Sequence, residues 1–167
     1  MNREILDGKI FIYPTDTVYG LGCNALNISS VEKIKKIKNR DFKKPLSIIA
    51  PSLKWIEKYC LVDFDLKKYL PGPYTLILKK KNKNFLKHVS SGDSIGVRMP
   101  DNEFCDEIRK TEVPFITTSV NLSGEKAIIR ISEIPKNIKD QVDIIVDEGE
   151  LSGRPSTIVI DGKEIKR

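Results

Sequence analysis

The 167-residue chain has a single histidine, His88, and three cysteines, Cys23, Cys60 and Cys105, which never form a CxxC pair. These counts exclude a zinc site built from clustered cysteine and histidine, and three scattered cysteines argue against a disulfide framework. We therefore expect buried free thiols in a reducing, cytoplasmic setting. A Ser-His-Asp triad would have to use His88, and no nucleophile-elbow pattern accompanies it.

Long hydrophobic runs are also missing. The longest, at 9–13 and 46–50, have the length of a strand and fall far short of the roughly 20 residues of a membrane span. The N-terminus begins Met1-Asn2-Arg3-Glu4 and lacks an apolar stretch, so we expect neither a signal peptide nor membrane contact. With 40% hydrophobic and 31% charged residues and no linker or repeat, the sequence predicts one folded domain over 1–167.

The usual nucleotide-binding motifs are absent as well. There is no GxxxxGK[ST], which rules out the common P-loop. The letters GLGCNA at 20–25 imitate GxGxxA, but residues 14–19 separate them from the preceding strand-like run and no helix clearly starts inside them. A dinucleotide-binding fold is therefore disfavoured.

What the chain does contain is strand-like runs that alternate with helix-like runs. The predicted strands are 9–13, 46–50, 74–80, 94–98, 115–118, 143–147 and 157–161. A capping-box pattern of Ser29 with Glu32 predicts a helix that carries Val31, Ile34 and Ile37 on one side.

Further helices are expected after Ser52, after Asp101 as a cap, and after Ser132, with Pro135 in the first turn. Short links at 71–73 and 161–162 permit antiparallel pairs. The predicted fold class is thus α/β, a twisted open mixed sheet of parallel and antiparallel strands flanked by helices.

Six segments join Thr, Ser, Asn or basic residues to Pro or Gly at strand ends, where open α/β sheets place ligands. In chain order they read PTDTVYGLG at 14–22, KNR at 38–40 followed by KKPL at 43–46, PGPYT at 71–75, GVRMP at 96–100, TSVNLSG at 118–124 and STIV at 156–159. PTDTVYGLG is the most specific of the six. Each of the others is weak alone, but all six together, in this order and at this spacing, form a strong pattern.

This set resembles the YrdC family of threonylcarbamoyl-AMP synthases, from about Ile10 to the C-terminus. The resemblance implies a YrdC/RibB-like fold and an adenylation reaction. Threonine's amino group captures bicarbonate or CO2, and the resulting carbamate attacks the α-phosphate of ATP and expels pyrophosphate. Mg2+ would be held mainly by the ATP phosphates, and a separate tRNA threonylcarbamoyl transferase would use the product. Lys44, Ile49 and Val120 depart from the residues common in relatives.

The resemblance also assigns roles. It places Lys38 and Arg40 on the phosphates as catalytic cations. Threonine would contact Thr17, Tyr19, Arg98, Ser119 and Ser156. The nucleotide would contact Ser94, Asn121, Ser123 and Arg167 as well.

Each of these residues has a structural alternative. Arg98 could form a surface ion pair with Asp101, Thr17 could satisfy a turn, and Tyr19 could belong to the core. Lys38 and Arg40 could merely offset a helix dipole, and on either reading their removal is expected to cost little stability.

Two rival functions stay open. The net charge of +6, with lysines at 33–38, 43–44 and 79–83, suits RNA as well as ATP or pyrophosphate, although lysine runs are usually solvated faces. An RNA-binding module without adenylation activity is therefore the main alternative, and contact with tRNA or other RNA is compatible with both readings. The sequence lacks the RNP aromatic pattern and the GXXG loop of RNA-binding modules. Within enzymes, a relative that adenylates carbamoyl phosphate or uses another amino acid is the second alternative.

Overall fold

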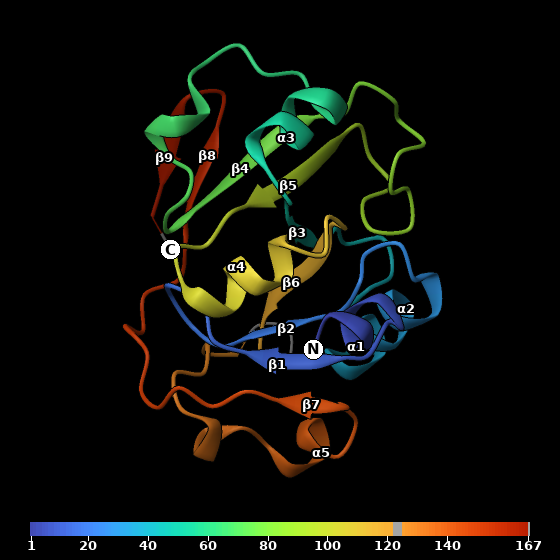
Figure 1. Ribbon diagram of the computed structural model, residues 1–167, viewed down its shortest axis with the longest axis vertical. Coiled ribbons are helices and arrows are strands. Elements are labelled where there is room, and N and C mark those ends of the chain that lie inside the picture. Colours follow the sequence, from blue (N-terminus) through green and yellow to red (C-terminus); the bar gives the residue numbers. More distant parts are fainter. Residues whose placement is uncertain (122–124, 167) are drawn as a thin grey trace.

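The computed structural model describes residues 1–121 and 125–166. Within these ranges nine strands form one mixed sheet in the order β7-β1-β2-β6-β3-β5-β4-β8-β9. Figure 1 shows this sheet extending from β8 and β9 at one end of the molecule to β7 at the other. The pairs β1/β7, β3/β5 and β4/β8 are parallel and the other neighbours are antiparallel. The predicted mixed α/β sheet is confirmed.

The strands are β1 (Phe11–Tyr13), β2 (Gly20–Gly22), β3 (Ser47–Ile49), β4 (Tyr74–Lys79), β5 (Ser94–Arg98), β6 (Phe115–Ser119), β7 (Ile144–Ile145), β8 (Thr157–Ile160) and β9 (Lys163–Ile165). The helices are α1 (Asn2–Leu6), α2 (Ile28–Ile37), α3 (Leu53–Tyr59), α4 (Glu103–Arg109) and α5 (Lys136–Lys139), with short 3-10 turns at Leu66–Lys68 and Ile131–Glu133.

Side chains alternate between two packed faces of the sheet, as the period of two in a strand requires. On β1, Ile12 enters the larger core cluster, whereas Phe11 and Tyr13 enter a smaller one. Helices α2 and α3 contribute to the larger cluster, and α1 and α4 to the smaller one. The sheet is therefore flanked by helices on both faces, as predicted.

Three helix starts differ from the prediction. Asn27, not Ser29, caps α2, because the Asn27 side chain accepts the Ser30 N–H at 3.1 Å while the Ser29 hydroxyl only donates to Asn27. Asn102, not Asp101, caps α4 by accepting the Cys105 N–H at 2.9 Å.

The third difference concerns Ser132, which lies inside a 3-10 turn. Pro135 is the residue that precedes α5. Ser52 does cap α3, as expected.

The GLG strand β2 was not predicted, because glycine is depleted in strands. Here a side chain at either glycine would collide with a neighbouring aromatic ring or backbone atom. A Cβ on Gly22 would lie 2.0 Å from the Ile116 carbonyl oxygen, and one on Gly20 would lie 2.8 Å from the Tyr13 ring. The segment is a paired strand with no helix inside it, which agrees with the rejection of a dinucleotide motif.

All three cysteines are free and buried, as expected. In the described ranges, every helix is too short or too polar to cross a bilayer.

Candidate active site

A cavity of about 490 Å³ opens on one face of the sheet, over the strands β6, β3, β5 and β4. Its floor is made of small polar residues. Ser47 is paired with Thr117 on one side and with Gly96 on the other, and Thr75 lies on the next strand. Their neighbours Ile48, Val97, Leu76 and Ile116 point into the larger core cluster. By alternation the polar residues occupy the opposite face, where the smaller apolar cluster stops.

The floor depends on the absence of a side chain at Gly96. A Cβ there would lie 2.4 Å from the Ser47 hydroxyl oxygen, which is closer than Cβ atoms come to other heavy atoms in proteins. Beside it, Thr75 and Ser156 share a buried hydroxyl–hydroxyl hydrogen bond of 2.7 Å. Ser47 and Thr117 were not predicted from the sequence. For Ser47 the available signal was a hydroxyl residue beside the apolar Ile48 and Ile49, whereas Thr117 lies among other hydroxyl residues of β6.

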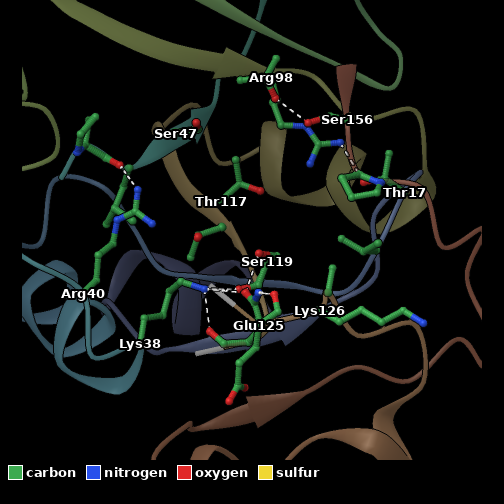
Figure 2. A pocket seen from close by; sticks show the side chains of 18 residues that line it. Thr17, Lys38, Arg40, Ser47, Arg98, Thr117, Ser119, Glu125, Lys126 and Ser156 are labelled. Atoms are coloured by element: carbon green, nitrogen blue, oxygen red, sulfur yellow. Dashed lines mark hydrogen bonds between the residues drawn. The ribbon is translucent and has the colours of Figure 1, made fainter. Parts of the chain in front are cut away.

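Arg98 ends β5 at one end of the cavity, beside Thr17 and Ser156 (Figure 2). Its Nη2 donates to Asp16 Oδ1 at 2.9 Å and to Thr17 Oγ1 at 3.2 Å. The Nε–H of Arg98 is buried and has no acceptor among the described residues. Arg98 therefore forms an ion pair, but its partner is Asp16 rather than Asp101, and the pair is buried rather than on the surface. One buried donor is left for a ligand.

The other end of the cavity is built on the C-terminus of α2. Lys38 caps this helix, and Asn39 follows with a left-handed φ of 48°. The Arg40 N–H returns to the Lys35 carbonyl at 3.0 Å and the Asn39 N–H to Lys36 at 2.9 Å, which is the Schellman arrangement. This turn sends the side chains of Lys38 and Arg40 toward the cavity that both line (Figure 2).

The ammonium of Lys38 makes its hydrogen bonds to residues outside its own helix. It donates to the carbonyl of Ser119 at 2.5 Å, and to the carbonyl and the side-chain Oδ1 of Asn121 at 2.8 and 2.9 Å. The Ser119 hydroxyl donates to the same Oδ1 at 2.7 Å. Lys38 thus joins the end of α2 to the segment after β6, and the interpretation that it only offsets the helix dipole does not account for these contacts.

Burial and the nearby charge of Arg40 lower the pKa of Lys38 to about 8. Burial also lowers the pKa of Arg40. The Arg40 side chain donates to the Pro45 carbonyl at 2.8 Å, and its Nε–H is buried without an acceptor among the described residues. Within the described part of the chain, Lys38 and Arg40 donate to carbonyl and amide oxygens and form no ion pair, so their charges favour a bound anion.

The structure brings seven of the predicted site residues to this one cavity, namely Thr17, Lys38, Arg40, Arg98, Ser119, Asn121 and Ser156. Two others lie elsewhere. Tyr19 is fully buried in the larger core cluster, and its hydroxyl donates to the Gly149 carbonyl at 2.8 Å. Ser94 is at the opposite end of β5 from Arg98, next to Lys79 of β4. Ser123 and Arg167 lie outside the described residues.

A resident metal ion would need a cluster of ligating side chains. Across residues 1–121 and 125–166, there is no group of three or more His, Cys, Asp or Glu side chains suited to this. Of the acidic residues, Glu125 lines the cavity and Asp16 is engaged by Arg98. That Mg2+ arrives on the ATP phosphates stays a prediction.

Comparison with known proteins agrees with this geometry. The model of the Sua5/YciO/YrdC family, described as "Telomere recombination", matches residues 3–166. The chain belongs to this family.

Two proteins and one crystal structure are similar to nearly the whole of this chain. A Methanocaldococcus jannaschii protein, provisionally named a threonylcarbamoyl-AMP synthase, is 43% identical over 95% of this chain and 77% of its own length. The Pyrococcus abyssi threonylcarbamoyl-AMP synthase is 32% identical over 94% of this chain, which spans 48% of that protein. The crystal structure of P. abyssi Sua5 complexed with L-threonine has a TM-score of 0.83 at 30% identity and covers 95% of this chain and 48% of that one.

Proposed function

We propose that this chain is a nucleotidyltransferase that makes threonylcarbamoyl-AMP and pyrophosphate from L-threonine, bicarbonate or CO2, and ATP with its Mg2+. The observation that carries the proposal is the presence, in one cavity, of two separate positions that offer the donors of a guanidinium or an ammonium group. Arg98 lies with the hydroxyl of Thr17 at one end, and Lys38 and Arg40 lie at the other. Such a cavity suits a small carboxylate at the first position and a polyphosphate at the second.

The reaction asks for positioning and for fixed positive charge. Threonine's amino nitrogen bonds to the carbon of CO2 and releases a proton to form a carbamate. With bicarbonate as the carbon source, a C–O bond breaks as the N–C bond forms and water leaves. A carbamate oxygen then bonds to the α-phosphorus as the bond to the β-phosphate breaks, and the electron pair leaves with pyrophosphate. Charge builds on phosphate oxygens, which Lys38 and Arg40 would stabilise from fixed positions. Neither cysteine nor histidine is among the described residues that line the cavity, which is consistent with a reaction that needs no side-chain nucleophile.

The names of the relatives support the same assignment. The relatives above are named for threonylcarbamoyl-AMP synthesis, and the P. abyssi structure contains L-threonine. We infer that the product is passed to a separate transferase for modification of tRNA next to the anticodon, because a mixed carbamic–phosphoric anhydride is too reactive to be an end product. A cytoplasmic location stays a prediction.

The decisive test is an assay of pyrophosphate release with purified protein and a panel of amino acids. Release is expected to require threonine, bicarbonate and Mg2+ together. Release that continues unchanged without threonine would contradict the proposal, and activity with carbamoyl phosphate instead would favour the alternative enzyme that adenylates carbamoyl phosphate. Binding of RNA with a steep salt dependence but without pyrophosphate release would favour the RNA-binding module.

A further inference from the structure

Asp16 is a largely buried carboxylate that contacts Arg98 from outside the cavity. Arg98 and Thr17 line the cavity, whereas Asp16 does not. The side chains of Arg98 and Asp16 are only 9% and 10% exposed, and their contact is 2.9 Å. The second oxygen of Asp16 accepts the backbone N–H of Asp101 at 3.1 Å. Both oxygens of the carboxylate are thus engaged, so its orientation is fixed.

This contact decides which donors of the guanidinium a ligand can reach. Nη2 is shared between Asp16 Oδ1 and Thr17 Oγ1. The buried Nε–H has no acceptor in the described part of the chain. Because the guanidinium is planar and rigid, holding Nη2 in place also fixes the direction of Nε–H.

The contact also sets the net charge at the Arg98 end of the cavity, which differs from that at the Lys38 end. Arg98 and Asp16 together carry no net charge. By contrast, Lys38 and Arg40 donate to carbonyl and amide oxygens, and neither forms an ion pair with a described residue. Net attraction follows net charge, so a polyphosphate gains most from Lys38 and Arg40. An amino acid zwitterion has no net charge, so the neutrality of the Arg98–Asp16 pair costs it little electrostatic attraction.

We propose that Asp16 is a positioning and specificity-determining residue that reserves the Arg98 end of the cavity for the amino acid and keeps phosphates out of it. This inference rests on the proposed function, since it takes threonine and ATP as the two ligands. Asp16 contacts neither ligand in this account and acts through Arg98 alone.

The test is calorimetric titration of threonine with and without saturating pyrophosphate. In the wild-type protein pyrophosphate occupies the Lys38 end, so the apparent Kd of threonine should change by less than about twofold. In Asp16→Asn the Arg98 end gains a net positive charge, and pyrophosphate should raise the apparent Kd by about tenfold or more. Asp101→Asn is the matched control: it removes the same charge nearby from an exposed side chain that does not contact Arg98, and it should behave as wild type.

Asp16→Glu separates charge from position and serves if Asp16→Asn does not fold. It keeps the charge, so pyrophosphate should still not displace threonine, but the longer side chain shifts the guanidinium and should weaken threonine binding several-fold. The inference is overturned if Asp16→Asn responds to pyrophosphate as wild type does, or if Asp16→Glu binds threonine with wild-type affinity. A wild-type protein that binds no threonine would instead overturn the proposed function.

Discussion

Lys38 and Asn121 are 83 positions apart in sequence, yet the ammonium of Lys38 contacts Asn121 twice, at the backbone carbonyl and at the side-chain oxygen. A third bond runs to the Ser119 carbonyl. These bonds make Lys38 a structural residue as well as a candidate phosphate ligand. They correct the expectation that its removal costs little stability.

Lys38→Ala should therefore lower the free energy of unfolding by about 1–3 kcal/mol, the scale of leaving buried acceptors without a donor. Urea denaturation followed by circular dichroism measures this. Arg40→Ala is the control, because Arg40 donates to a single described carbonyl and should cost less. Equal losses in the two variants would mean that the three Lys38 bonds contribute no more to stability than the single Arg40 bond does.

Anion binding should depend on the protonation of Lys38. Burial, assisted by the charge of Arg40, lowers the pKa of Lys38 to about 8, below the ordinary value of 10.5. The charged form binds pyrophosphate, so affinity should decrease as the pH rises above about 8, toward tenfold per pH unit for one proton released. Titration calorimetry between pH 7 and 9.5 measures the slope. Arg40→Ala should keep this slope with its onset at a higher pH, because the charge of Arg40 helps to lower the pKa of Lys38. Lys38→Ala should lose the slope, whereas an identical slope and onset in both variants would assign the titration to the ligand.

Arg98→Lys should damage threonine binding although the charge is kept. A lysine ammonium is a point donor and cannot reach Asp16, Thr17 and a ligand in the way that a planar guanidinium does. Threonine affinity should decrease by about 1.5–3 kcal/mol, the scale of hydrogen bonds between charged groups, while ATP affinity stays unchanged. Separate calorimetric titrations of the two ligands decide this. If Arg98→Lys binds threonine as well as wild type does, Arg98 is reduced to a structural ion pair.

Gly96→Ala tests the floor of the cavity. Its Cβ would approach the Ser47 hydroxyl to 2.4 Å, so either Ser47 or the strand must shift. We expect a loss of about 1–3 kcal/mol in the free energy of unfolding, as for other overpacked sites, together with weaker threonine binding. Gly92→Ala is the control, since no atom lies within 4 Å of a Cβ there. A neutral result at Gly96 would show that the floor adapts.

Local patterns predicted much of the fold because they report on local physics. Val31, Ile34 and Ile37 follow the helical period and are buried as expected. The cap at Asn27 was missed by two positions, since Asn27 and Ser29 are both good caps and only the geometry of the turn chooses between them. The strand β2 was missed because its glycines are required by the rings of Tyr13 and Phe115, which no local pattern reveals.

The candidate site was predicted through motifs rather than physics. The family resemblance assigned Lys38, Arg98 and Ser119 to one site, and all three line the cavity. It did not indicate Ser47 or Thr117, whose importance comes from their place on the sheet face under the cavity. Nor did it indicate Asp16, because its role depends on a partner 82 positions away.

The polar floor has a consequence for the lifetime of the protein. On this face of the sheet, the smaller apolar cluster packs around β1 and α4, and the cavity lies over β6, β3, β5 and β4. A bound substrate supplies there the contacts that side chains supply elsewhere, and it binds only the folded chain. Occupancy should therefore raise the melting temperature with ligand concentration. In a cell, starvation for threonine or ATP would then both slow the reaction and expose the idle protein to proteolysis, so that its abundance follows the supply of what it consumes.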